Sequence, residues 1–217
     1  MGFRLPLKPN TQPLKPPLSS LIAHNSPLPS PVPKHSTINL PPVAVVVSRY
    51  NATITDALLA GAIEEYLAAG GDRVHLDVLD APGTFELVTI ADAAAASNRY
   101  AGVVCLGCIV KGQTRHDEVL AHAVAHGLVN CSLKHQTPIT LGVLTVNNNN
   151  QARARAGGKL GNKGSEAMEA LLMTLVTLAG LGAMKQTHPA THTITHTPRP
   201  DKLAQKTKRT ARTKTGK

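Results

Sequence analysis

A short polar segment that follows a long apolar run combines a histidine with residue types that bind anions. The segment, residues 111–118, contains Gly112, Gln113, Thr114 and His116, and the apolar spacing after it predicts a helix that Thr114 caps. A loop that leads into a helix presents free backbone N–H groups, which bind anions well, and histidine exchanges protons readily near neutral pH. The segment therefore predicts an anion site with an acid/base beside it, although an ordinary turn with an idle surface histidine fits the same spacing.

Strands and helices alternate through the middle of the chain. Apolar runs predict buried strands over residues 43–47, 74–79 (at a sheet edge), 102–110 and 138–146. Helical spacing predicts helices from about residue 55, over 84–96, after Thr114, through Arg155, and over 163–178. The side chains expected to face the core include Leu67, Val119, Ala123 and Val176. This alternation is typical of a three-layer α/β/α sandwich on a parallel four-stranded sheet.

Ligands of such sheets bind beyond the carboxyl ends of the strands. The segments expected at that edge are residues 50–51, 83–86, 112–116 and 146–155. The unusual polar and aromatic residues of the chain gather in the same segments, which favours a functional role for His116 over an idle turn.

The two ends of the chain differ in composition from its middle. Residues 1–42 hold eleven of the sixteen prolines and no acidic residue, and residues 181–217 hold nine basic residues and one acidic residue. The formal net charge of +10 therefore belongs to the ends. We predict a disordered proline-rich arm over 1–42, a folded domain over 43–180 and a disordered basic tail over 181–217. A solubilising tail is favoured over one that binds polyanions weakly, and nucleic acid is otherwise not an expected partner.

The three cysteines, an odd number, suit a reducing compartment rather than a disulfide framework. Cys105 and Cys108 have the spacing of a redox motif, but both fall within the predicted buried strand, where a thiolate is not activated. No second cysteine pair is present to complete a zinc site. Glu118, His122 and His126 share one face of the predicted helix, and a solvated or subunit-contact face is favoured there over a metal site.

No apolar run is long enough to cross a membrane, and the N-terminal segment lacks the apolar core of a secretory signal. We therefore expect a cytoplasmic protein without membrane contact. A plastid location is the alternative if residues 1–42 act as a transit peptide.

Six motifs, in order, resemble the lumazine synthase family of riboflavin biosynthesis. Arg49-Tyr50-Asn51 is similar to the family's Arg-Phe-Asn turn, and residues 82–87 match its Pro-Gly-Ala/Thr-Phe-Glu-Leu. Residues 107–116 match its strand, loop and histidine. Segments 142–145, 151–157 and 161–164 follow in family order. The resemblance covers about residues 43–180 and implies a flavodoxin-like fold.

The resemblance implies a transferase reaction without cofactor or metal. The family condenses 5-amino-6-(D-ribitylamino)uracil with 3,4-dihydroxy-2-butanone 4-phosphate to 6,7-dimethyl-8-ribityllumazine, with release of phosphate and water. The pyrimidine amine attacks the ketone, an imine forms, phosphate leaves and the ring closes. A flavin-binding or redox module on a similar sheet and a shell-forming scaffold without activity are the alternatives.

Family roles carry over to thirteen residues of this chain. His116 is the implied acid/base catalyst, Gln113, Thr114 and Arg155 the implied phosphate ligands, and Lys163 a secondary ligand. The implied contacts to the ribitylaminouracil are Tyr50, Thr84, Phe85, Glu86, Cys108, Ile109, Val110 and Leu141.

The chain departs from the family pattern at four positions. Tyr50 replaces a Phe, Leu141 stands where Phe is common, Asp117 stands where an aromatic residue is usual, and Asn150 replaces a frequent Glu. These changes bear on substrate affinity and on the pH optimum, and they remove no catalytic role.

The family also implies a homo-oligomer. Its members form pentamers, some of which build icosahedral shells, and the active site lies between subunits. By this resemblance Tyr50, Glu86 and His116 face Leu141 and Arg155 across a subunit boundary.

Overall fold

A parallel sheet of four strands forms the centre of the domain. The computed structural model describes residues 40–184 and residue 187, and the structural findings concern this part of the chain. All three strand pairs are parallel, which confirms the predicted sheet and the edge position of its second strand. The strands are β1 (Val43–Ser48), β2 (Leu76–Ala81), β3 (Gly102–Val110) and β4 (Ile139–Val146), in the spatial order β2-β1-β3-β4.

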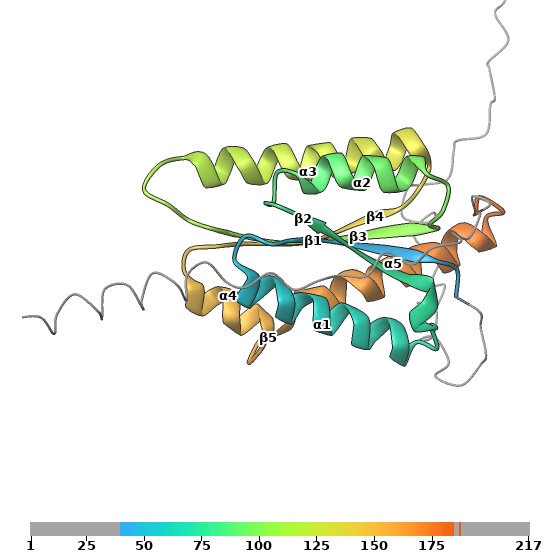
Figure 1. Cartoon of the computed structure of the whole chain (residues 1–217), viewed down its shortest axis with the longest axis horizontal. Helices are drawn as coiled ribbons and strands as arrows, with labels where there is room; N and C mark the ends of the chain where they lie inside the picture. Colours follow the sequence, from blue (N-terminus) through green and yellow to red (C-terminus); the bar gives the residue numbers. More distant parts are fainter. Residues whose placement is uncertain (1–39, 185–186, 188–217) are drawn as a thin grey trace, which may run out of the picture. The chain divides into compact units, whose positions relative to one another are not determined.

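Helices cover both faces of the sheet, as Figure 1 shows. On one face lie α2 (Leu87–Ala96) and α3 (His116–His135). On the other lie α1 (Ala52–Ala68), α4 (Asn149–Arg155) and α5 (Lys163–Gly180). A short 3-10 helix, η2 (Arg73–His75), precedes β2, and a small antiparallel hairpin that was not predicted, β5 (Ala156–Gly158) with β6 (Gly161–Asn162), separates α4 from α5. The three-layer α/β/α sandwich is therefore confirmed.

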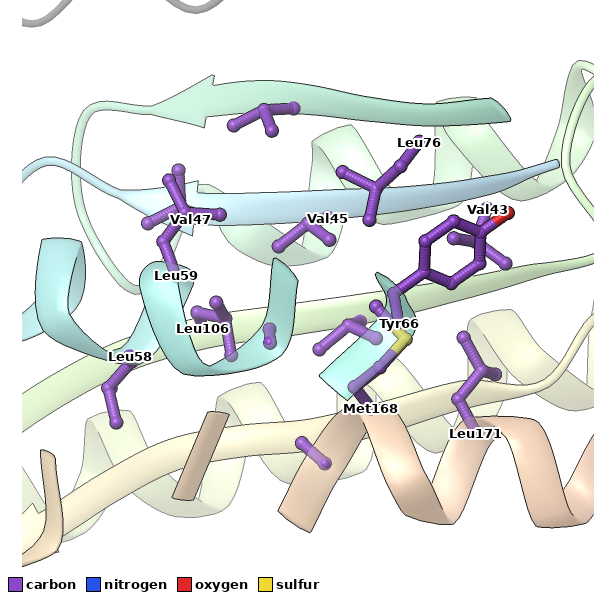
Figure 2. Packing of buried hydrophobic residues seen from close by; sticks show 14 of the residues in the cluster. Val43, Val45, Val47, Leu58, Leu59, Tyr66, Leu76, Leu106, Met168 and Leu171 are labelled. Carbon is purple, nitrogen blue, oxygen red and sulfur yellow. The ribbon is translucent and has the colours of Figure 1, made fainter. Parts of the chain in front are cut away.

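The alternation of side chains along β1 fills both layers of the core. Val43, Val45 and Val47 belong to the cluster under α1 and α5, whereas Ala44 and Val46 belong to the cluster under α2 and α3. All five side chains are fully buried, and burial of a side chain the size of valine or leucine contributes about 1.5–3 kcal/mol. Figure 2 shows the first cluster, in which Leu58, Tyr66, Met168 and Leu171 join the valines.

Three elements begin at residues other than those predicted. Helix α1 begins at Ala52 because Asn51, with φ 61°, reverses the chain directly after β1. Helix α2 begins at Leu87 rather than at residue 84, since residues 84–86 form a turn. Strand β2 begins at Leu76 because the η2 turn takes up residues 73–75.

The N-terminus of α3 also differs from the prediction. Arg115, and not Thr114, occupies the N-cap position. The Thr114 hydroxyl instead accepts a hydrogen bond from the His116 N–H at 3.4 Å. The Thr114 hydroxyl therefore pairs with a free N–H group of the first turn, although Thr114 lies one position before the N-cap residue.

Four side chains that were expected to face the core are exposed instead. Leu67 is 43% exposed, Val119 63% and Val176 56%, and Ala123 is also exposed. The prediction failed because α1, α3 and α5 carry apolar residues on both sides, so that spacing alone does not distinguish the inner face from the outer face.

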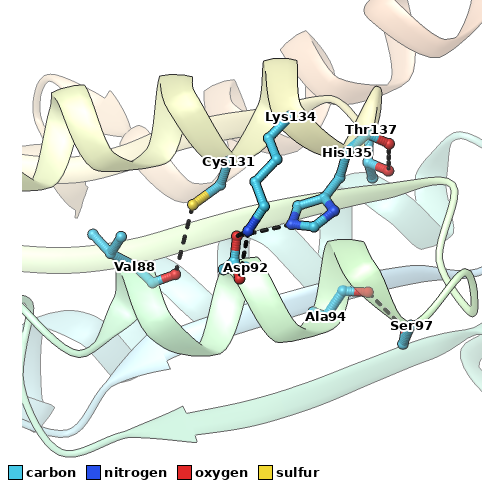
Figure 3. Close-up of polar contacts among 8 residues, drawn as sticks. All are labelled: Val88, Asp92, Ala94, Ser97, Cys131, Lys134, His135 and Thr137. Atoms are coloured by element: carbon cyan, nitrogen blue, oxygen red, sulfur yellow. Dashed lines mark hydrogen bonds and ion pairs between the residues drawn. The ribbon is translucent and has the colours of Figure 1, made fainter.

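A cluster of polar contacts joins α2 to α3 on one side of the sheet (Figure 3). The Asp92 carboxylate lies 2.8 Å from the His135 ring and 3.2 Å from Lys134 Nζ. These hydrogen bonds, that of His135 first, lower the pKa of the Asp92 carboxyl below its ordinary value. Cys131 lies beside them, with its thiol 3.9 Å from the carbonyl oxygen of Val88. The cluster supplements the apolar packing between the two helices.

The predicted proline-rich arm and basic tail lie almost entirely outside the described residues. At the start of the described part, Leu40 packs against the core, and the Pro42 carbonyl accepts a hydrogen bond of 2.8 Å from the Ala101 N–H. None of the helices between Leu40 and Thr187 is long and apolar enough to cross a membrane.

Candidate active site

The carboxyl ends of the four parallel strands meet at one edge of the sheet, and the segments expected to bind a ligand follow them (Figure 1). Residues 49–51 follow β1, 82–86 follow β2, 111–115 follow β3, and α4 begins shortly after β4. The strand order places the turn after β1 between those after β2 and β3.

The turn after β1 is fixed at both ends and leaves its tyrosine free. The Arg49 guanidinium lies 2.7 Å from the Asp56 carboxylate, and the Asn51 amide donates a hydrogen bond of 3.0 Å to the carbonyl oxygen of Cys108 on β3. Tyr50 is 69% exposed. The turn therefore presents an aromatic face at the edge of the sheet, where a planar ligand can stack on it.

Asn51 lies in an edge segment that the sequence predicts, but no individual role was predicted for it. Its left-handed backbone, φ 61°, is one that asparagine adopts more readily than most residues. Its amide holds Tyr50 and the end of β3 at a fixed separation. An asparagine in the turn three residues after a buried strand was the signal available in the sequence.

The loop after β2 contains a buried residue that packs inside the fold and two residues with exposed side chains. Thr84 is buried, and its side chain packs against Gly107, where a Cβ would lie 3.0 Å from the threonine methyl. Phe85 is 61% exposed, so its ring is not part of the core. The Glu86 side chain is exposed and folds back over Gly83. The loop thus offers a carboxylate and an aromatic ring beside Tyr50.

The segment after β3 presents donors for an anion. Cys108 and Ile109 are buried and Val110 is partly buried, so mainly their backbone groups are available to a ligand. The N–H groups of Gln113 and Thr114 have no hydrogen-bond partner among the described residues. This agrees with the anion site that the sequence predicts.

His116 lies at the start of α3, close along the chain to these donors. Its side chain is exposed, as are those of Gln113 and Thr114. An imidazole placed there can exchange a proton with a molecule whose anionic group is bound by the loop.

A second group of candidate residues lies on the opposite face of the sheet. Arg155 ends α4 and Lys163 begins α5, and both contact the carboxylate of Glu166, at 2.8 Å and 3.2 Å. Arg155 also donates to the carbonyl oxygen of Leu160. The guanidinium, more than Lys163, lowers the pKa of Glu166, and the carboxylate in turn raises that of Arg155. Glu166 was not predicted to take part, although its spacing of three residues from Lys163 on a helix indicates such a pair.

Leu141 lies apart from both groups. It stands on the edge strand β4, opposite Cys105, and is 45% exposed. Five residues separate it from the end of the strand at Val146, a distance of about 16 Å. Tyr50, the loop after β2 and the segment up to His116 thus follow the carboxyl ends of neighbouring strands, whereas Leu141 lies within β4, and Arg155 and Lys163 lie at the ends of α4 and α5.

The cysteines are free thiols inside the fold. All three are buried. Burial raises the pKa of the Cys108 thiol to about 11 and raises that of Cys105 further. Neither forms a thiolate near neutral pH, so the redox spacing of the pair carries no reactivity. Within residues 40–184, no group of three or more His, Cys, Asp or Glu side chains is arranged to hold a metal ion.

The fold described above defines a flavodoxin-like α/β protein, a class in which ligands bind beyond the carboxyl ends of the strands. A sequence model of the 6,7-dimethyl-8-ribityllumazine synthase family matches residues 41–179, and the chain belongs to this family. The resemblance predicted from the six motifs is therefore confirmed.

Several relatives match this same region over most of their own length. A 6,7-dimethyl-8-ribityllumazine synthase 1 from Caulobacter vibrioides is 44% identical over 138 residues, which cover 64% of this chain and 90% of the relative. A 6,7-dimethyl-8-ribityllumazine synthase from Nitratiruptor is 44% identical over 139 residues, with coverage of 64% and 90%. One from Helicobacter pylori (strain Shi470) is 43% identical over 133 residues, with coverage of 61% and 85%.

Proposed function

We propose that this chain condenses 5-amino-6-(D-ribitylamino)uracil with 3,4-dihydroxy-2-butanone 4-phosphate to 6,7-dimethyl-8-ribityllumazine, with release of phosphate and water. Family membership over residues 41–179 supports the reaction. The edge of the sheet is the observation that assigns the reaction to a site. The segments at this edge present an exposed aromatic ring, a carboxylate, unpaired N–H groups and a histidine.

The ribitylaminouracil occupies the side of the edge between β1 and β3. Tyr50 stacks on the pyrimidine ring, and the backbone of Cys108, Ile109 and Val110 pairs with its polar edge. Glu86 accepts hydrogen bonds from the ribityl hydroxyls. The backbone of Thr84 and Phe85 adds contacts to the same chain, and Leu141 lines the pyrimidine pocket from a neighbouring chain.

The butanone phosphate occupies the loop after β3. The N–H groups of Gln113 and Thr114 bind the phosphate at the start of α3. The planar, charged guanidinium of Arg155 donates further hydrogen bonds to it. Lys163 lies near the phosphate or ribityl oxygens. The two substrates are then held side by side, and much of the rate enhancement comes from their proximity and orientation.

His116 moves the protons. The pyrimidine amine attacks the ketone carbon, and the carbinolamine loses water to give an imine. Phosphate then leaves by elimination, and the enol that remains becomes a ketone. The ribityl-bearing nitrogen attacks this carbonyl, and loss of a second water closes the ring. His116 delivers a proton to the departing hydroxyl and takes one from carbon as phosphate departs. No cofactor or metal takes part in this scheme.

The separation of the two groups of site residues supports an assembly. Leu141 lies five positions before the carboxyl end of β4, away from the edge that carries Tyr50, Glu86 and His116. By the family resemblance, Leu141 and Arg155 complete the site from a neighbouring copy. Such an interface joins two different surfaces of the protein, and repetition of it closes into a ring. We infer a pentamer, and an icosahedral shell of pentamers is a further form of the same contact.

We further propose that the catalytic domain spans residues 43–180, with an arm over 1–42 and a basic tail over 181–217. A cytoplasmic location fits three reduced cysteines. A plastid location is the alternative if the arm is a transit peptide.

The deciding experiment follows lumazine absorbance and phosphate release in the purified protein supplied with both substrates. We expect equal formation of the two products. Arg155→Ala and His116→Asn are expected to weaken it strongly, the second by about 10²–10⁴ in kcat. Arg153→Ala, an exposed arginine of the same short helix α4, is the matched control and should stay close to wild type.

The two alternatives predict other outcomes. A flavin or redox module would show bound-flavin absorbance without lumazine. A scaffold would give no product from a folded oligomer. Either result would overturn the proposed reaction.

A further inference from the structure

The outward face of α3 carries two histidines that the proposed reaction does not use. His122 and His126 are both exposed, and neither ring has a hydrogen bond or ion pair with another described residue. Between Val119 and Leu133 the helix contains no Asp, Glu, Lys or Arg. The two imidazoles are therefore the only ionisable side chains of this stretch, apart from the buried thiol of Cys131.

Their spacing places both rings on one side of the helix. Residues four apart in an α-helix are separated by about 6 Å along the axis and point in nearly the same direction. A pair of histidines with this spacing on one helix is the arrangement that holds zinc in metalloprotease helices, where each nitrogen lies about 2.0–2.1 Å from the metal. The 20-residue helix α3 supplies a rigid frame for the pair.

In place of the solvated or subunit-contact face expected from the sequence, we propose that His122 and His126 together bind a divalent transition metal of the type that prefers imidazole, namely Zn²⁺, Ni²⁺ or Cu²⁺. Neutral ring nitrogens favour these ions over Mg²⁺ and Ca²⁺, which take oxygen ligands. Water fills the remaining positions, because no third His, Cys, Asp or Glu of the described part completes the group. Glu118, one turn upstream, is held by the Arg115 guanidinium at 3.1 Å.

This site is separate from the proposed acid/base. His116 is the first residue of α3, and two turns of helix separate it from the midpoint of the pair. Metal on His122 and His126 links consecutive turns of the helix and leaves His116 free for proton transfer.

The test measures the reactivity of each histidine toward diethyl pyrocarbonate, which modifies unprotonated imidazoles. The full-length protein is labelled with and without zinc chloride, and tandem mass spectrometry reads the extent of labelling residue by residue. We expect zinc to slow labelling of His122 and His126 several-fold and to leave His116, on the same helix, unchanged. This readout also separates the pair from His188, His192 and His196, which lie outside the described residues.

A variant distinguishes binding by the pair from binding by single rings. In His122→Gln, one of the two ligands is lost, and His126 should label at the same rate with and without zinc. The substitution is at an exposed position, so circular dichroism should match wild type. Persistent protection of His126 in this variant would overturn the proposal, as would labelling unaffected by zinc or the absence of labelling at both rings without metal.

Discussion

Arg155 and Glu166 lie 2.8 Å apart across the junction of α4 and α5, and Lys163 shares the same carboxylate at 3.2 Å. The carboxylate holds two cations that the proposed function assigns to phosphate and ribityl oxygens. It therefore positions the guanidinium before the substrate arrives.

Glu166→Gln should weaken binding of the butanone phosphate more than it slows turnover. Exposed ion pairs contribute about 0.2–1 kcal/mol, and both partners are partly exposed. We therefore expect KM for this substrate to rise about two- to fivefold, with kcat nearly unchanged. Steady-state kinetics with each substrate varied in turn measures this. Glu169→Gln, an exposed glutamate of the same helix, is the control, and an equal effect in both variants would contradict a positioning role.

Tyr50 should contribute through its ring and not through its hydroxyl. The side chain is 69% exposed, and its hydroxyl has no hydrogen-bond partner in the described part. Tyr50→Phe should retain activity. Tyr50→Ala should raise KM for the ribitylaminouracil about five- to a hundredfold, because base–aromatic stacking contributes about 1–3 kcal/mol.

The matching stability measurement separates binding from folding. An exposed ring contributes little to the core, so the urea midpoint of Tyr50→Ala should stay within experimental error of wild type. A large loss of stability, or an unchanged KM, would count against the stacking role.

Two glycines of α5 should respond to alanine in opposite directions. A Cβ at Gly164 would lie 1.9 Å from the carbonyl oxygen of Leu58, a backbone atom of α1, whereas a Cβ at Gly180 would have no atom within 4 Å. Gly164→Ala should separate α1 from α5 and destabilise the fold by about 1–3 kcal/mol or more. Gly180→Ala should be neutral or stabilising by up to about 1 kcal/mol. Urea unfolding compares the two, and equal effects would show that the close helix contact is not required.

The contact between Asp92 and His135 should make the α2–α3 packing sensitive to acid. The folded state lowers the pKa of the Asp92 carboxyl, so it stabilises the fold above the ordinary pKa of an aspartate. That contribution is lost as the pH falls through the lowered pKa of the folded state. The carboxyl is partly exposed, which limits the effect to about 1 kcal/mol or less.

Asp92→Asn should therefore reduce stability at pH 7 and differ less from wild type at pH 3. Urea midpoints measured across this range give the comparison. Glu64→Gln, an exposed glutamate without a described partner, should leave the pH dependence unchanged. If the difference between Asp92→Asn and wild type does not shrink toward low pH, the contact does not stabilise the folded state.

The strand runs were predictable because a buried parallel strand is apolar on both faces, as most residues of Val43–Ser48 and Gly102–Val110 are. The buried faces of the helices were less predictable from the sequence. Val119 and Val176 are apolar yet exposed, because apolar residues on both sides of a helix do not distinguish its inner face from its outer face. The spacing of apolar residues also does not predict local backbone conformations, such as the left-handed Asn51 that starts α1 early.

The edge of the sheet was predictable from the topology, because parallel strands place their carboxyl ends together. The contacts there were not. The amide of Asn51 reaches Cys108 across 57 positions of sequence, and Glu166 reaches Arg155 across eleven. Such pairs depend on how two elements pack, which one sequence without its fold does not specify.

The division of the site residues between two regions of one chain has a genetic consequence. A chain with Arg155→Ala keeps an intact His116 region, and a chain with His116→Asn keeps an intact Arg155 region. Each variant alone builds only defective sites. In the proposed ring, co-expression of the two variants should pair one intact region with the other in a fraction of the sites, and we expect two loss-of-function alleles of the same gene to restore growth between them.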